Sequence, residues 1–260
     1  MGYYVIAVGG TGNKILEAIV YGAAAGVFYT PGRNGARVPL QTVRALAVDV
    51  DAACGNTTRA KQAGEYYERI RAAFPKGFPR RGFWTQLDLQ RWNMNLSKRA
   101  SSVDSMVKNH KSEQLLARTL FAPTESSLEY AEGFRGHPDL GVLFFADVLK
   151  TLDEALPQDE MARLLSQMRG ELEAGERVKV ILVGSIFGGT GASGIPAISR
   201  FLREHFAAHR QLFELGAVLM LPYYKVPAST RDETMEIVVK SNDFLDKART
   251  ALQYYGMEGM

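Results

Sequence analysis

The chain of 260 residues is poor in the side chains that build disulfides and metal centres. Cys54 is its only cysteine, which excludes a disulfide within the chain and a metal site made of cysteines. Of its four histidines, His205 and His209 stand four residues apart, but no cluster of glutamate or cysteine accompanies them. A pair on a helix surface is therefore the favoured interpretation, and no metal ligand set is predicted from these residues.

Long apolar runs and a strong charge of one sign are also missing. The longest apolar runs, near 178–183 and 215–221, have the length of strands and not of membrane spans. The N-terminus enters a predicted strand almost at once, without the features of a signal peptide. A formal net charge of +3 does not by itself indicate nucleic acid binding, and an apolar fraction of 46% is ample for a core. We expect a globular cytoplasmic protein.

Glycine, by contrast, is abundant and gathers where predicted strands end. The apolar run 3–8 leads into GGTG and a predicted helix at 13–25, and the run 178–183 leads into GGTGASG and a helix from residue 195. Glycine lets the backbone approach a ligand closely, and the free N–H groups at a helix start attract anions. Both loops are therefore predicted to hold phosphates.

The order of the elements predicts an α/β fold, with a Rossmann-like parallel sheet flanked by helices. A second strand is expected at 43–50. Further helices are expected at 142–156, 159–174, 195–209 and 233–255, with a strand at 215–221. The stretch 57–135 is polar and often basic, carries Trp84 and Trp92, and has predicted helices near 61–74 and 112–120. We interpret it as a mainly helical basic insertion lying over the sheet, which the tryptophans anchor.

Three nucleotide-binding schemes compete for the glycine loops. The P-loop is set aside, because the segment from Gly10 to Lys14 lacks its spacing and the hydroxyl after the lysine. The segment Gly189–Gly194 fits GxGxxG, but no acidic residue stands convincingly at a strand end about 20 residues on. A Rossmann-type NAD-binding protein stays an alternative. The third scheme has two glycine loops converging on one nucleotide.

Several segments, in order, resemble the tubulin/FtsZ superfamily, which uses that third scheme. VIAVGGTGNKI resembles its first phosphate loop, LAVDVDA its second, GHPDLG the loop that senses the γ-phosphate, and GSIFGGTGASGIP its signature loop. VLMLPYYKVP resembles the next strand with its ribose loop, and Ser241-Asn242 the helix start that reads the guanine edge. The resemblance covers most of the chain outside about 57–135.

The resemblance implies GTP or GDP as ligand, with Mg²⁺ as a companion ion near Asp49 and Asp51. The first loop would hold the α- and β-phosphates, the signature loop the β- and γ-phosphates, and the loop from His137 to Gly141 would respond to the γ-phosphate. The implied nucleotide-binding residues are Gly9, Gly10, Thr11, Gly12, Asn13, Asp49, Asp51, His137, Gly141, Gly188, Gly189, Thr190, Gly191, Ala192, Ser193, Gly194 and Asn242.

The chain also departs from the family pattern. Phe187 and Ala192 replace residues of the signature loop, and no segment matches the family's second domain or its acidic hydrolytic loop. We interpret Asp243 and Asp246 as a solvated helix face, and we name no catalytic residue. The expected protein is a nucleotide-binding domain over 1–260 that self-associates or forms filaments and hydrolyses GTP only on assembly. The alternative is a non-catalytic module that docks a partner through the basic insertion. The choice between GTP and ATP as the ligand stays open.

Overall fold

A computed structural model of the chain describes residues 1–51, 53–75, 81–94, 96–152, 158–223 and 243–257. Its centre is a five-stranded sheet in the order β5-β4-β1-β6-β7, with all neighbours parallel. The strands are β1 (Gly2–Val8), β4 (Thr42–Val48), β5 (Gln86–Arg91), β6 (Val178–Ser185) and β7 (Phe213–Met220). The predicted Rossmann-like parallel sheet is thereby confirmed.

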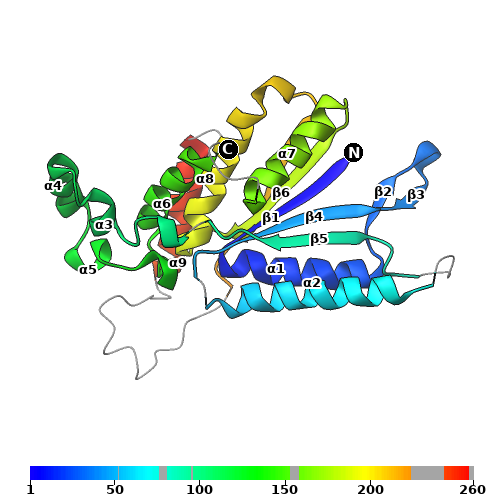
Figure 1. Cartoon of the computed structure of the whole chain (residues 1–260), viewed down its shortest axis with the longest axis horizontal. Coiled ribbons are helices and arrows are strands. Elements are labelled where there is room, and N and C mark those ends of the chain that lie inside the picture. Colours follow the sequence, from blue (N-terminus) through cyan, green and yellow to red (C-terminus); the bar gives the residue numbers. More distant parts are fainter. Residues whose placement is uncertain (52, 76–80, 95, 153–157, 224–242, 258–260) are drawn as a thin grey trace.

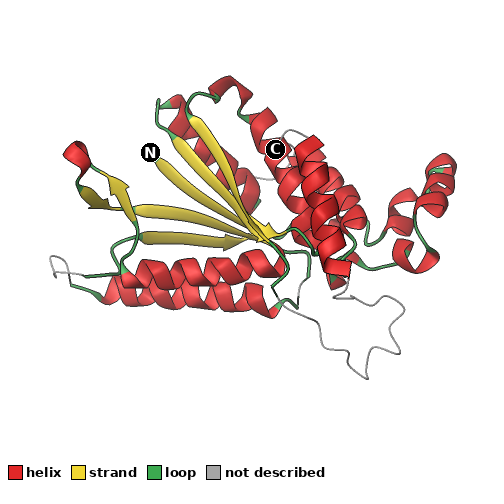
Figure 2. Ribbon diagram, turned by 180° about the vertical axis from the view of Figure 1, so that it is seen from behind, coloured by secondary structure: helices red, strands yellow, loops and turns green. Residues whose placement is uncertain are grey.

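Helices cover both faces of this sheet, as Figures 1 and 2 show. One face carries α1 (Gly9–Ala25) and α2 (Gly55–Ala73), and the other carries α6 (Pro138–Lys150), α7 (Glu160–Glu173) and α8 (Gly189–His205). Successive side chains of a strand point to opposite faces. Ile6 therefore joins the core under α6–α8, whereas Ala7 joins the core under α1 and α2. Burial on both sides explains why the central strands are continuously apolar.

Smaller elements lie around the sheet. The strands β2 (Tyr29–Pro31) and β3 (Arg37–Pro39) form a hairpin, and 3₁₀ turns occur at Arg33–Gly35, Leu96–Lys98, Tyr130–Glu132 and Ala207–His209. Helix α9 (Phe244–Met257) packs beside the start of α8 through Phe187 and Phe244. None of the helices in the described ranges is long and apolar enough to cross a membrane.

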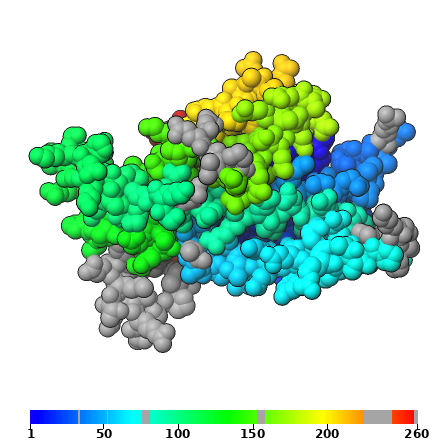
Figure 3. Space-filling model, in the orientation of Figure 1, coloured from blue at the N-terminus to red at the C-terminus, as the bar shows by residue number. Residues whose placement is uncertain are grey.

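An arm of short helices projects from one end of the sheet (Figures 1 and 3). It contains α3 (Val103–Val107), α4 (Lys111–Leu120) and α5 (Pro123–Ser126). This arm is smaller than the insertion predicted over 57–135. Helix α2 packs on α1, and β5 pairs with β4 with Leu87 opposite Val43, so both extend the main α/β body. The sequence analysis did not predict β5, because its sequence QLDLQR is polar: β5 is an edge strand with one buried side chain.

The two tryptophans of this region donate hydrogen bonds to the main α/β body. The indole of Trp92 is buried and donates to Asp159 over 3.0 Å, and that of Trp84 donates to the carbonyl of Phe28 over 3.3 Å. Trp92 therefore ties the segment after α2 to the start of α7, and Trp84 ties it to the loop after α1. The helix predicted at 233–255 is described only from Phe244 onward, and residues 224–242 lie outside the described part of the chain.

Candidate functional site

The order of the strands marks one edge of the sheet as the place for a ligand. From β1 the chain moves outward to β4 and β5, then returns to the other side of β1 with β6 and β7. The switch in direction lies between β1 and β6. In open α/β sheets, ligands bind beyond the carboxyl ends of the strands at this switch point. Here α1 follows β1 on one face and α8 follows β6 on the other.

Both of these helices begin earlier than the sequence suggests. The glycines predicted to form loops before helices at 13 and 195 are instead the first turns of α1, from Gly9, and of α8, from Gly189. Likewise, α6 begins at Pro138, inside the segment predicted as the third loop. Glycine permits these turns because it leaves room for close contacts with other backbone segments.

The starts of α1 and α8 have free N–H groups and carry no compensating charge. Neither helix has a side-chain cap, and neither has an acidic residue in its first turn. Two other helices have a side-chain cap, since Asp159 accepts from the N–H of Ala162 at the start of α7 and Ser102 caps α3, whereas α2, α4 and α6 have none. Uncapped N–H groups and the positive end of the helix dipole attract an anion. These two starts are therefore suited to phosphate.

The two starts touch each other at glycines. Gly9 has a φ of +73°, a backbone conformation that residues with a side chain rarely adopt. A Cβ on Gly9 would also lie 3.2 Å from the backbone nitrogen of Gly191. A Cβ on Gly189 would lie 3.3 Å from the backbone nitrogens of Gly136 and His137. The first, third and fourth predicted loops therefore converge at one point.

A cavity of about 450 Å³ opens between the two helix starts. Seven of the predicted site residues line this cavity, together with four residues that the sequence analysis did not assign to the site. The predicted ones are Gly9, Gly10, Thr11, Gly188, Gly189, Thr190 and Gly191. The additional ones are Lys14, Asn56, Ser185 and Tyr223. Asn56 comes from the first turn of α2, an element whose start the sequence analysis placed too late.

Asn13 and Asp49 lie beneath this cavity and not in its wall. The amide Nδ2 of Asn13, which is fully buried, donates to the hydroxyl of Thr57 over 2.7 Å, while its Oδ1 has no partner in the described part of the chain. The Thr57 hydroxyl in turn donates to Asp49 Oδ2 over 3.5 Å. A buried polar chain thus joins the first loop, the second loop and α2.

Asp49 is 3% exposed, and this burial raises the pKa of its carboxyl above the ordinary value. Hydrogen bonds from the Cys54 thiol and the Asp51 N–H act in the opposite direction, since they favour the ionised form. Asp51 is partly exposed, and its Oδ1 accepts the N–H of Ala53 over 2.8 Å. The described residues contain no group of three or more His, Cys, Asp or Glu placed to hold a metal ion.

The remaining predicted residues mainly fix α8 and α6. Ser193 is buried and donates to the carbonyl of Gly189 over 2.8 Å, and a side chain on Gly141 would collide with it. Gly12 packs against the backbone of β1 and β6, and Gly194 packs against Val8 and Phe145. These glycines allow close packing, which differs from the ligand contact that the sequence predicts. Asn242 lies outside the described residues.

His137 stands at the start of α6 beside acidic groups, with its Nδ1 3.4 Å from Glu125 Oε1. Together with Ala192 it lines a second cavity of about 670 Å³ between α6 and α9. This cavity shares Gly188 with the first. His137 and Ala192 therefore lie next to the glycine cavity but outside its wall.

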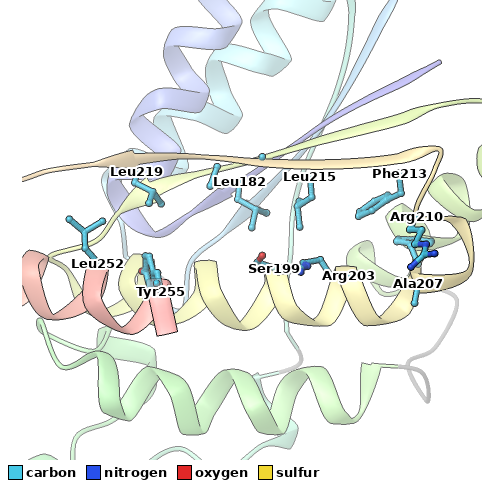
Figure 4. A pocket seen from close by; sticks show the side chains of 14 residues that line it. Leu182, Ser199, Arg203, Ala207, Arg210, Phe213, Leu215, Leu219, Leu252 and Tyr255 are labelled. Carbon is cyan, nitrogen blue, oxygen red and sulfur yellow. The ribbon is translucent and has the colours of Figure 1, made fainter. Parts of the chain in front are cut away.

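A larger cavity, of about 860 Å³, lies farther along α8 and has a different lining. Figure 4 shows Leu182, Leu215 and Leu219 facing α8, with Arg203 and Arg210 toward the other end. No glycine of the two helix starts lines it. Although this cavity is larger, it is not the candidate phosphate site, because the uncapped starts of α1 and α8 lie elsewhere.

Comparison with known proteins agrees with the arrangement at the switch point. A family model described as tubulin-like matches residues 4–237, which include most of β1, the other four strands of the sheet, both open helix starts and the buried hydrogen bonds that link Asn13, Thr57 and Asp49. A search among curated proteins finds no significant match.

Proposed function

The chain belongs to the tubulin-like family, and on that premise we propose that it binds a guanine nucleotide across the starts of α1 and α8. The observation that carries the proposal is the contact of Gly9 with Gly191 above the switch point. Two uncapped helix starts, which meet at residues without side chains, leave a cavity whose walls offer N–H groups to phosphate. Family membership supports guanine as the base.

In this proposal the phosphates lie between Gly9–Thr11 and Gly188–Gly191. The third loop, at Gly136 and His137, touches Gly189, and this contact supports a role for the loop in responding to the terminal phosphate. Asn13 and Asp49 support the first loop from below. Mg²⁺ commonly binds through one or two carboxylates together with phosphate oxygens and water, and the partly exposed Asp51 is the carboxylate that suits this role.

The proposal assigns nucleotide binding to this chain and hydrolysis to an assembly. Hydrolysis of a phosphoanhydride needs a positioned water and a group that orients it. The described residues that line the glycine cavity include no carboxylate and no histidine. We propose that the missing group comes from a neighbouring subunit, so that self-association into filaments and GTP hydrolysis occur together in a cytoplasmic protein.

Calorimetry with GTP, GDP, ATP and NAD tests the binding proposal. We expect GTP and GDP to bind more tightly than ATP, and NAD not to bind. The variant Gly10→Val fills the cavity wall and should abolish binding, whereas Gly170→Ala, where an added Cβ meets nothing within 4 Å, serves as the matched control. Binding of NAD without GTP would overturn the tubulin-type site in favour of a dinucleotide site.

A second candidate function is partner docking through the arm. The leucines of α4 are unusually exposed for large apolar residues: Leu115 is 70%, Leu116 58% and Leu120 63% exposed. Such a cluster on a projecting helix marks an interaction surface. We propose that it contacts another copy or a protein partner, and that residues 96–135 form a subdomain for this purpose.

Sedimentation distinguishes docking from nucleotide-driven assembly. Replacing Leu115, Leu116 and Leu120 by serine should abolish association through the arm but leave GTP affinity unchanged, since the arm does not line the cavity. Assembly that depends on GTP and survives the triple variant would favour the glycine edge as the interface. Assembly that needs the leucines but not GTP would favour the docking module.

A further inference from the structure

Lys14 occupies a position in the glycine cavity that the comparisons do not assign. It lies on α1, directly after the first phosphate turn, and its side chain is exposed. Among the described residues that line the cavity, Lys14 alone carries a charge at neutral pH. Its Nζ lies 5.5 Å from the centre of the Tyr223 ring, which also lines the cavity. The ammonium group is thus held at the cavity by a cation–π contact.

A polyphosphate in this cavity brings more negative charge than the two helix starts offset. Each helix end contributes the equivalent of about half a positive charge. The buried carboxyl of Asp49 already accepts hydrogen bonds from the N–H of Asp51 and the hydroxyl of Thr57. The described residues also contain no cluster of three metal-binding side chains. Of the carboxylates of Asp49 and Asp51, that of the partly exposed Asp51 is the one suited to a bound metal, and Lys14 is the one cation among the described residues that line the cavity.

We infer that Lys14 is a phosphate-binding residue whose contribution to affinity increases with the number of phosphates in the ligand. An ammonium group is a point charge with three donors, and its attraction grows with each phosphate oxygen that it reaches. The inference rests on the proposed function for the location of the nucleotide, but it does not depend on the base. Lys14 therefore favours triphosphate over diphosphate, and it reduces the dependence of binding on Mg²⁺.

The test is calorimetry of the full chain with tripolyphosphate, GTP, GDP and guanosine, each with Mg²⁺ and with EDTA. Replacing Lys14 by methionine keeps the length of the side chain and removes its charge. We expect Lys14→Met to weaken GTP and tripolyphosphate about 10- to 100-fold, the loss typical of one charge-assisted hydrogen bond, and to leave guanosine unchanged. Lys14→Arg should retain most of the affinity, and the effect of EDTA should be larger in Lys14→Met than in wild type.

Lys61→Met is the matched control, because Lys61 is exposed on α2 and pairs only with Glu65 one turn away among the described residues. Equal affinity of wild type and Lys14→Met for tripolyphosphate would overturn the inference, and so would an equal loss for guanosine. Thermal melts exclude unfolding, with Lys14→Gln as a second variant. If tripolyphosphate binds through Lys14 but no guanine nucleotide binds, the proposed function fails and the phosphate-binding role stands.

Discussion

The hydroxyl of Tyr255 donates a hydrogen bond to the carbonyl oxygen of Ala192 over 2.9 Å. Ala192 is the fourth residue of α8, and its usual helical donor would be the N–H of the residue four positions on. That residue is Pro196, which has no N–H. Tyr255, on α9, supplies the donor from outside the helix. The bond therefore ties α9 to the start of α8, next to the cavity.

Removal of this hydroxyl should destabilise the fold. Tyr255 is buried, so Tyr255→Phe leaves the carbonyl of Ala192 without this partner and should lower the free energy of unfolding by about 1 to 2 kcal/mol. Denaturation in urea measures the change. The neighbouring Tyr254 is exposed, and Tyr254→Phe should have little effect. A double variant checks the mechanism: Pro196→Ala restores a helical N–H, so Tyr255→Phe should cost less in that background.

The glycines of the first loop should differ in their tolerance of alanine. A Cβ on Gly12 would lie 2.5 Å from the carbonyl oxygen of Val183 and 2.9 Å from the carbonyl carbon of Ala7, and neither backbone can yield. On Gly10, the nearest atoms are side-chain ends, at 3.3 Å on Asn56 and 3.4 Å on Cys54. Gly12→Ala should lower the melting temperature by about 5 °C or more, whereas Gly10→Ala should remain folded. Equal melting temperatures would contradict this packing.

These contacts show what the sequence could and could not predict. Apolar runs ended by glycine located β1, β6 and the edge at which we propose that the ligand binds, because buried parallel strands and helix starts leave local signals. The roles within the loops were not local. Asn13 and Ser193 look like ligand donors in the sequence, yet their partners are Thr57 and Gly189. Strand β5 escaped prediction because an edge strand buries little of its surface.

The labelling rate of the single cysteine, Cys54, should reveal whether a ligand occupies the cavity. The Cys54 thiol lies next to Gly10, and burial followed by the charge of Asp49 raises its pKa. Since the thiolate is the reactive form, labelling by a maleimide should be slow at pH 7 and faster at pH 9. Bound GTP should slow it further by covering the first loop. Cys54→Ser gives the background, and a labelling rate that GTP leaves unchanged would place the ligand away from Gly10.

The buried carboxyl of Asp49 should make stability depend on pH. Its pKa is raised in the fold, mainly by burial, so the native state holds the proton more tightly than the unfolded chain does. Stability should therefore fall as the pH rises from the ordinary carboxyl pKa, near 4, through the raised value, and then level off. Asp49→Asn removes this fall, so its advantage over wild type should grow across that window. Asp104→Asn, at an exposed position, controls for the substitution itself.

The bond between Asn13 and Thr57 should couple stability to ligand binding. Thr57→Val keeps the shape of the side chain and leaves the buried amide of Asn13 without its acceptor, at a cost of about 1 to 3 kcal/mol. Because Asn13 lies on the first turns of α1 and Thr57 on α2, the loss should also loosen the first phosphate loop and weaken GTP binding. Thr57→Ser retains the hydroxyl and should restore both properties. Thr58→Val, at the exposed neighbour, controls for the substitution itself, and full affinity in a destabilised Thr57→Val would show that the bond serves the fold alone.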